Sequence, residues 1–230
     1  MKKILLKACI FIYIATLIIG LYVNYVNGNI NDFFMTLVAV FTPLIIPALF
    51  YLLKLKITEE IMIINLVFVY FASLIGSGFN GYQIPFFDKV LHFTSGIFIS
   101  MLAIIIYWII KKDRRISDEK EHRIFMLFVL NTNLAIAMLW ELYEYMMLVL
   151  FNNDCINHYT TGVHDSMTDM ICALIAGLIV LYAVNRYYKH KKNNCLVNYV
   201  KIFMIKILIK SISIEAIISS MLEWLPKDVK

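Results

Sequence analysis

The stretch HDSMTDMICALIAGLIVLYAVNRY, residues 164–187, joins a polar heptad to one of the most hydrophobic runs of the chain. The segment is long enough to cross a bilayer as a helix, which takes about 20 residues. In such a helix Asp165 and Asp169 are four residues apart and lie on the same face. Two acids at the start of an apolar helix either cap it at the water boundary or belong to a site that other segments complete.

The composition places the whole chain among integral membrane proteins. Hydrophobic residues make up 61% of the 230 residues and charged residues only 16%. A chain of this length has room for about six spanning helices and leaves no separate soluble domain. The net charge of +5 does not indicate a nucleic-acid partner, because the basic residues cluster between hydrophobic segments and there determine membrane topology.

The hydrophobic segments predict an all-α, polytopic transmembrane bundle of about six spans within residues 1–193. The second span contains Pro43 and Pro47, which are predicted to kink the helix without ending it, because neighbouring helices can satisfy the freed carbonyl groups. The stretch from Gly76 to Tyr82 is too rich in glycine to continue the third helix. The predicted spans are residues 4–26, 33–55, 61–76, 88–110, 124–151 and 165–187.

Lysine and arginine alternate between the two sides of the predicted spans. The N-terminus and the segments after the second, fourth and sixth spans are basic, whereas loops 27–32, 76–87 and 152–164 contain no Lys or Arg. By the positive-inside rule, both termini are cytoplasmic and these loops face outward. Residues 194–230 are predicted to form an amphipathic helical tail on the lipids of the inner leaflet, with a seventh span as the alternative.

Three predicted spans each carry a pair of ionisable residues, and such groups are rare and costly inside a membrane. At a rise of about 1.5 Å per residue, all three pairs lie in the outer half of the membrane. The pairs are Asp88 with His92 in the fourth span, Glu141 with Glu144 in the fifth, and Asp165 with Asp169 in the sixth.

Each pair also has a purely structural interpretation. Asp88 and Asp165 fit first-turn acids stabilised by the helix dipole, and His92 fits a hydrogen-bonded core residue. Glu141 and Glu144 are harder to explain in this way, because they lie far from a helix end and the fifth span has no cationic residue to neutralise them.

Together these side chains make a hard, oxygen-rich ligand set that suits Mg, Mn, Zn or Fe. The ion would offset the mutual repulsion of the acids and could polarise a substrate or activate water. His92, Glu141 and Glu144 are the predicted catalytic residues, and Asp88 is predicted to orient His92, with Trp140 and His164 as further neighbours. The predicted metal ligands are His92, Glu141, Glu144, Asp165 and Asp169.

Three motifs carry a resemblance to a known family. They are Asp88-Lys89-x-x-His92-Phe93-x-x-Gly96, Trp140-Glu141-x-x-Glu144 and Gly162-x-x-Asp165-x-x-x-Asp169-Met170. Over residues 76–187 the chain resembles the YjdF-like bacterial inner-membrane proteins. It is more loosely similar to the VanZ-like family, which is linked to glycopeptide resistance and commonly has Gln and Asn where this chain has Glu144 and Asp169. The resemblance implies a multi-pass protein of the bacterial cytoplasmic membrane.

Three functions remain open at this point. The first is a metal-dependent membrane hydrolase or transferase acting on a lipid headgroup or a lipid-linked envelope intermediate. The second is a transporter or proton relay in which Glu141 and Glu144 titrate and Asn131 and Asn133 continue the path inward. The third is a structural or partner-binding protein whose acids only form hydrogen bonds between helices.

Overall fold

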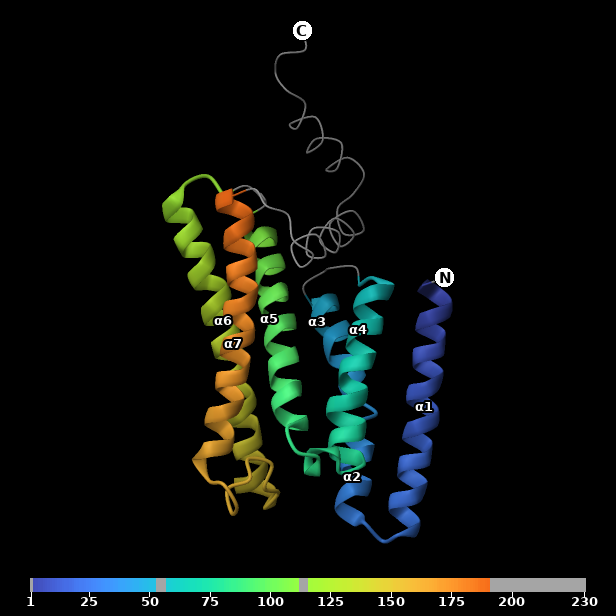
Figure 1. Ribbon diagram of the computed structural model, residues 1–230. Coiled ribbons are helices and arrows are strands. Elements are labelled where there is room, and N and C mark those ends of the chain that lie inside the picture. The colour runs from blue at the N-terminus through green and yellow to red at the C-terminus, as the bar shows by residue number, and fades with distance from the viewer. Residues whose placement is uncertain (1, 53–56, 112–115, 191–230) are drawn as a thin grey trace. The chain divides into compact units, whose positions relative to one another are not determined.

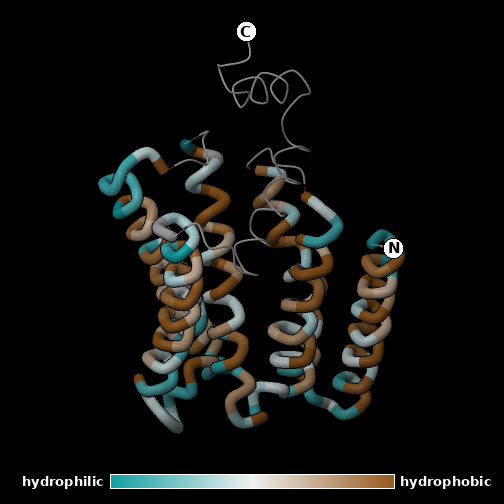
Figure 2. The backbone as a smooth tube through the Cα atoms, turned by 45° about the horizontal axis from the view of Figure 1, so that its top comes forward, coloured by the Kyte–Doolittle hydropathy of each residue, from teal (hydrophilic) through white to brown (hydrophobic). Residues whose placement is uncertain are grey.

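The computed structural model describes residues 2–52, 57–111 and 116–190, and within them it contains helices and no strand (Figure 1). Figure 2 shows that hydrophobic residues predominate along the helices and hydrophilic residues gather toward their ends. The described residues provide six segments long and apolar enough to cross a membrane, which confirms the all-α, six-span prediction. These segments are Lys2–Val26, Ile30–Leu52, Glu59–Gly78, Phe87–Trp108, Glu119–Phe151 and Val163–Tyr188. The predicted tail, residues 194–230, lies outside the described residues.

The chain divides into two compact units at Ile84. The described residues before this boundary form the first unit, and those from Pro85 onward form the second. The first unit consists of α1 (Lys2–Val26), α2 (Ile30–Val38), the 3-10 turn η1 (Thr42–Leu44), α3 (Ile45–Leu52), α4 (Glu59–Val69), the π-helix η2 (Tyr70–Gly78) and the 3-10 turn η3 (Gly81–Gln83).

The two prolines break the second span into α2, η1 and α3, so the prediction that they kink the helix without ending it is wrong: α2 ends at Val38, although the segment still spans Ile30–Leu52. A proline has no N–H, so Pro43 and Pro47 leave the carbonyl groups of Ala39 and Pro43, four residues earlier, without helical partners. The Tyr13 hydroxyl of α1 donates to the Ala39 carbonyl at 2.7 Å, and Asn65 Nδ2 of α4 donates to the Pro43 carbonyl at 2.7 Å. Neighbouring helices therefore satisfy both freed groups, as membrane burial requires.

The third span does not end before the glycines, and the prediction that they stop the helix is wrong. Helix α4 continues as η2 through Gly78. A Cβ atom on Gly78 would lie 2.7 Å from Thr36 Oγ1, and Asn24 Nδ2 donates to the Gly78 carbonyl at 2.8 Å. The glycine thus permits a close approach between helices, a role that small residues often have in membrane proteins.

The second unit consists of three helices that pack side by side, α5 (Phe87–Lys111), α6 (Glu119–Phe151) and α7 (Val163–His190) (Figure 1). Helix α6 begins at Glu119 rather than Ile124, because a capping box starts it. Asp118 Oδ1 accepts the Glu121 N–H at 2.8 Å, and Glu121 Oε2 accepts the Ser117 N–H at 2.6 Å.

One buried amide connects all three helices of this unit. Asn133 of α6 is completely buried and donates from Nδ2 to Ser100 Oγ of α5 and to the Ala173 carbonyl of α7, each at 3.0 Å. Helices α5 and α7 come close enough for this because Gly96 has no side chain: a Cβ there would lie 2.6 Å from the same Ala173 carbonyl oxygen. Helix contact over a small residue with an interhelical hydrogen bond is a common packing mode in membranes.

We expect Asn133→Ala to lower the free energy of unfolding by about 1 kcal/mol, because hydrogen bonds between membrane helices are worth roughly that much. Asn131→Ala is the matched control, since Asn131 is exposed and donates only to the Leu127 carbonyl of its own helix. Melting temperatures of the two variants in the same detergent check this. Equal melting temperatures would show that Asn133 does not hold the helices together.

The unit is polar on one side of Asn133 and apolar on the other. Toward the cytoplasmic end predicted from the basic residues, Ile104 and Val129 lie one turn and Val180 about two turns beyond the level of Asn133, and all three are completely buried. The ionisable pairs all lie on the opposite side of Asn133. The buried ionisable side chains of the second unit are therefore gathered at one end of its three helices.

Candidate functional site

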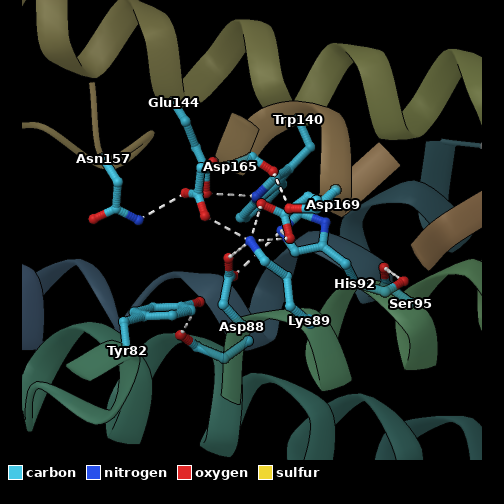
Figure 3. A network of polar contacts seen from close by, with 12 residues as sticks. Tyr82, Asp88, Lys89, His92, Ser95, Trp140, Glu144, Asn157, Asp165 and Asp169 are labelled. Carbon is cyan, nitrogen blue, oxygen red and sulfur yellow. Dashed lines mark hydrogen bonds and ion pairs between the residues drawn. The ribbon is translucent and has the colours of Figure 1, made fainter. Parts of the chain in front are cut away.

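Lys89 lies among three aspartates at this polar end (Figure 3). Its ammonium group donates to Asp165 Oδ1 at 2.6 Å and to Asp169 Oδ2 at 2.9 Å, and it lies 3.2 Å from Asp88 Oδ2. Asp88 belongs to α5 and the other two aspartates to α7. Sequence reasoning did not include Lys89 among the site residues, although it stands in the first of the quoted motifs; its signal was a cation in the first turn of a spanning helix.

The aspartates reach Lys89 because of where their helices begin. Asp88 and Asp165 lie in the first turns of α5 and α7, where the helix dipole favours negative charge, and Asp169 follows one turn later on the same face. Asp165 is also held from the loop before α7, since Asn157 Nδ2 donates to Asp165 Oδ2 at 2.7 Å. Asp165 and Asp169 are thus engaged with a lysine rather than serving only as helix caps.

His92 is buried beside this cluster. Its Nε2 atom lies 3.3 Å from Asp88 Oδ1 and 3.9 Å from Asp169 Oδ1. The structure therefore brings Asp88 and His92 together, as the sequence predicts. A carboxylate against one ring nitrogen fixes the orientation of an imidazole and its tautomer.

Glu141 is a buried carboxylate without a hydrogen bond. The residue is only 8% exposed. Neither carboxylate oxygen accepts a hydrogen bond of ordinary geometry from any described residue, although Ser166 lies nearby. Glu144, one turn away, accepts a hydrogen bond from Trp140 Nε1 at 2.8 Å on Oε1. A buried acid with no partner is expensive, so Glu141 requires a counter-charge or a proton.

Two groups of side chains in this unit could each offer three ligand atoms within 4.8 Å of one another: His92 with Glu141 and Glu144, and Asp88 with His92 and Asp169. His92 belongs to both. Lys89 already occupies the aspartate side of the second group. The five predicted metal ligands are therefore divided, since Asp165 falls in neither group.

The remaining predicted neighbours have different positions. Trp140 contacts the site through Glu144, as described above. His164 is exposed, and within the described part of the chain no hydrogen bond or ion pair involves its side chain; only its carbonyl group accepts, from Thr168 Oγ1 at 2.9 Å. The structure thus separates His164 from the polar cluster.

The charges of the site are unevenly balanced. Lys89 pairs with all three aspartates, whereas among the described residues no lysine or arginine forms an ion pair with Glu141 or Glu144. Among the ionisable pairs of the three helices, the two glutamates beside His92 are therefore the ones without a described lysine or arginine partner. A divalent ion bound there would supply the missing positive charge.

The loop before α7 adds a cysteine to the surroundings of Glu144. Burial, together with the negative charges of Glu144 and Asp154, raises the pKa of the Cys155 thiol to about 11. The thiol is consequently protonated at neutral pH, and only a thiolate is an effective nucleophile. Cys155 is therefore a poor nucleophile at neutral pH.

Six candidate spans, with ionisable side chains buried among three of them, define a polytopic α-helical membrane protein. Residues 5–190 match the family model described as "Predicted membrane protein (DUF2238)", and the chain belongs to that family. This is the YjdF-like family that the three motifs indicate, so that resemblance is confirmed; the looser VanZ-like similarity stays a prediction. No curated protein and no solved structure matches the chain.

Proposed function

We propose that His92, Glu141 and Glu144 bind a divalent metal ion and that the protein is a metal-dependent hydrolase or transferase of the bacterial cytoplasmic membrane. Both termini face the cytoplasm, and the site acts on a lipid headgroup or a lipid-linked envelope intermediate from the outer half of the membrane. The observation that carries this proposal is Glu141, a buried carboxylate with no hydrogen bond of ordinary geometry and no lysine or arginine partner among the described residues, next to an imidazole and a second glutamate.

The donor set fits this chemistry. One imidazole with two carboxylates suits Mn, Zn or Fe better than Mg, which prefers oxygen ligands and keeps several waters. Three protein ligands leave coordination positions open for water and substrate, as in catalytic zinc sites. The ion would polarise a substrate oxygen or lower the pKa of water, while Asp88 keeps His92 oriented and Lys89 neutralises the aspartates.

The proton-relay alternative is less well supported. Asn131 donates to its own helix and Asn133 to Ser100 and Ala173, so neither connects to the glutamates. On the predicted cytoplasmic side of Asn133, the next buried side chains of the three helices are apolar, such as Val129 of α6. A proton relay requires a chain of polar groups through both halves of the membrane. A site that opens only to the outer side requires polar groups in the outer half alone.

Metal removal tests the proposal. We expect the purified protein to hold about one equivalent of Mn, Zn or Fe, because three ligands define a single ion position. Chelation should lower the melting temperature, and readdition should restore it, since an ion at 100 times its Kd contributes about 2.7 kcal/mol to the free energy of unfolding. Elemental analysis and thermal melting measure both effects. A protein that retains no ion and melts at the same temperature with and without these metals would rule out the site.

A further inference from the structure

We propose that the lipid acted on by this protein carries an ammonium headgroup, which Trp140 and Tyr143 bind on the lipid-facing surface of α6. The inference rests on the proposed function, because it names the lipid class that reaches the same site. It is carried by three observations: an exposed aromatic pair hydrogen-bonded to the site, an excess of negative charge, and the depth of both along α6.

The aromatic pair connects the outside of the bundle with the buried site. Trp140 is 46% exposed and Tyr143 is 48% exposed, and their ring centroids lie 5.4 Å apart. Both belong to a membrane-spanning segment, so their exposed faces meet lipid. Trp140 also donates to Glu144 Oε1 at 2.8 Å. Two aromatic faces next to a carboxylate form the chemistry that binds ammonium groups, through cation–π and ionic attraction.

The charge of the polar end selects against anionic headgroups. Lys89 is the only lysine or arginine within residues 85–96 and 137–170, and its ammonium group already holds three aspartates. Six carboxylates lie in these ranges and exceed the combined charge of that lysine and one divalent ion; they belong to Asp88, Glu141, Glu144, Asp154, Asp165 and Asp169. A diphosphate headgroup would therefore meet net repulsion and no available cationic side chain, whereas an ammonium group would meet attraction.

The depth of Trp140 and Tyr143 in the membrane is close to that of the lipid headgroups. Helix α6 has 33 residues, so it is about 50 Å long and exceeds the hydrocarbon thickness of about 30 Å by some 20 Å. With the excess shared between the ends, the boundary of the hydrocarbon lies about 10 Å from Phe151, which is the distance to Glu144 along the helix. Tyr143 then lies at this boundary, and Trp140 lies about 6 Å further along the helix on the hydrocarbon side, with its indole N–H donating to Glu144 at the boundary. Amphipathic rings at this level can contact a headgroup while the acyl chain follows the apolar surface of α6.

The experiment uses the full chain in vesicles with equal amounts of phosphatidylethanolamine and phosphatidylglycerol that have identical acyl chains. The protein is extracted into detergent, and the retained lipid is quantified by mass spectrometry. We expect the wild type to retain phosphatidylethanolamine over phosphatidylglycerol by roughly threefold to tenfold, and Trp140→Leu and Tyr143→Leu to bring this ratio close to one. Trp140→Phe should keep an intermediate ratio, because it retains an aromatic face.

Tyr182→Leu is the matched control. Tyr182 is 62% exposed on α7, but the Arg186 guanidinium already lies 5.8 Å from its ring centroid. Its loss should leave the lipid ratio unchanged; an equal loss of preference in this variant would overturn the inference, and so would a wild-type ratio of one. Release of the bound lipid by soluble glycerophosphoethanolamine would show that the water-soluble headgroup, not a lipid, is the ligand.

Metal content measured on the same samples separates the two proposals. Tyr143→Leu should lose the lipid preference and keep its ion, because Tyr143 contacts Trp140 and forms no described hydrogen bond with a proposed ligand. A wild type that holds the ion without preferring phosphatidylethanolamine overturns only the lipid inference. A wild type that shows the preference but holds no ion overturns the metal-dependent function and leaves the ammonium-binding surface standing.

Discussion

Replacing Lys89 with Met is expected to lower the free energy of unfolding by about 3 kcal/mol, the low end of the range for removing one partner of a buried ion pair. The Lys89 side chain is only 24% exposed in the native protein. Its replacement would leave Asp88, Asp165 and Asp169 facing one another without a cation. The repulsion acts between α5 and α7, so the two helices should separate more easily. Thermal melting in detergent measures the loss.

Two further variants show whether charge is the cause. Lys89→Arg keeps the positive charge and should lose clearly less stability than Lys89→Met. Adding Asp165→Asn to Lys89→Met removes one of the repelling charges and should recover part of the loss, which a double-mutant cycle quantifies. If Lys89→Met melts like the wild type, or if Asp165→Asn makes it worse, Lys89 is not the counter-charge of this cluster.

The contacts of Lys89 with α7 could not be predicted from the local sequence. Hydropathy and helix periodicity locate the six spans and place Asp165 and Asp169 on one face, because those features depend on neighbours within a few residues. The partners of Lys89 on α7 lie 76 and 80 residues away. No spacing rule within one helix connects them, so a lysine beside Asp88 could not be assigned to a site on another helix.

The glycines after the third span illustrate the same limit. Read locally, Gly76 and Gly78 weaken a helix. In the fold their missing side chains admit Tyr82 and Thr36, whose approach a Cβ would block, and the backbone remains helical. For the prolines of the second span, the freed carbonyl groups were predictable, because a missing N–H always frees the carbonyl four residues earlier. The end of α2 at Val38 was not predicted.

The roles of Glu141 and Glu144 were partly predictable. Their place inside a span marks them as unusual from sequence alone, since charge is costly there. The sequence could not show that Lys89 serves the aspartates and leaves Glu141 without a partner. That division is what reduces the predicted five ligands to His92, Glu141 and Glu144.

Glu141→Gln is expected to have opposite effects on metal binding and on stability. The variant loses an anionic ligand, so its metal affinity should fall by about 100-fold or more, since changes even in the groups behind a ligand cost 10- to 100-fold. The metal-free variant should be more stable than metal-free wild type by about 1 kcal/mol, because a buried carboxylate without a hydrogen bond is replaced by a neutral amide. Sites kept for function are commonly less stable than their inactive variants.

Metal titration and chemical denaturation of the chelated protein measure the two effects separately. Glu121→Gln is the matched control on the same helix: Glu121 pairs with Lys111 and accepts the Ser117 N–H at 2.6 Å, so its loss should lower stability and leave metal affinity unchanged. A Glu141→Gln variant that is less stable than wild type without metal, and that binds metal as the wild type does, would assign this glutamate to the packing of the helices. The opposite signs expected here follow from a carboxylate that the fold buries without satisfying, which only a bound cation or proton can compensate.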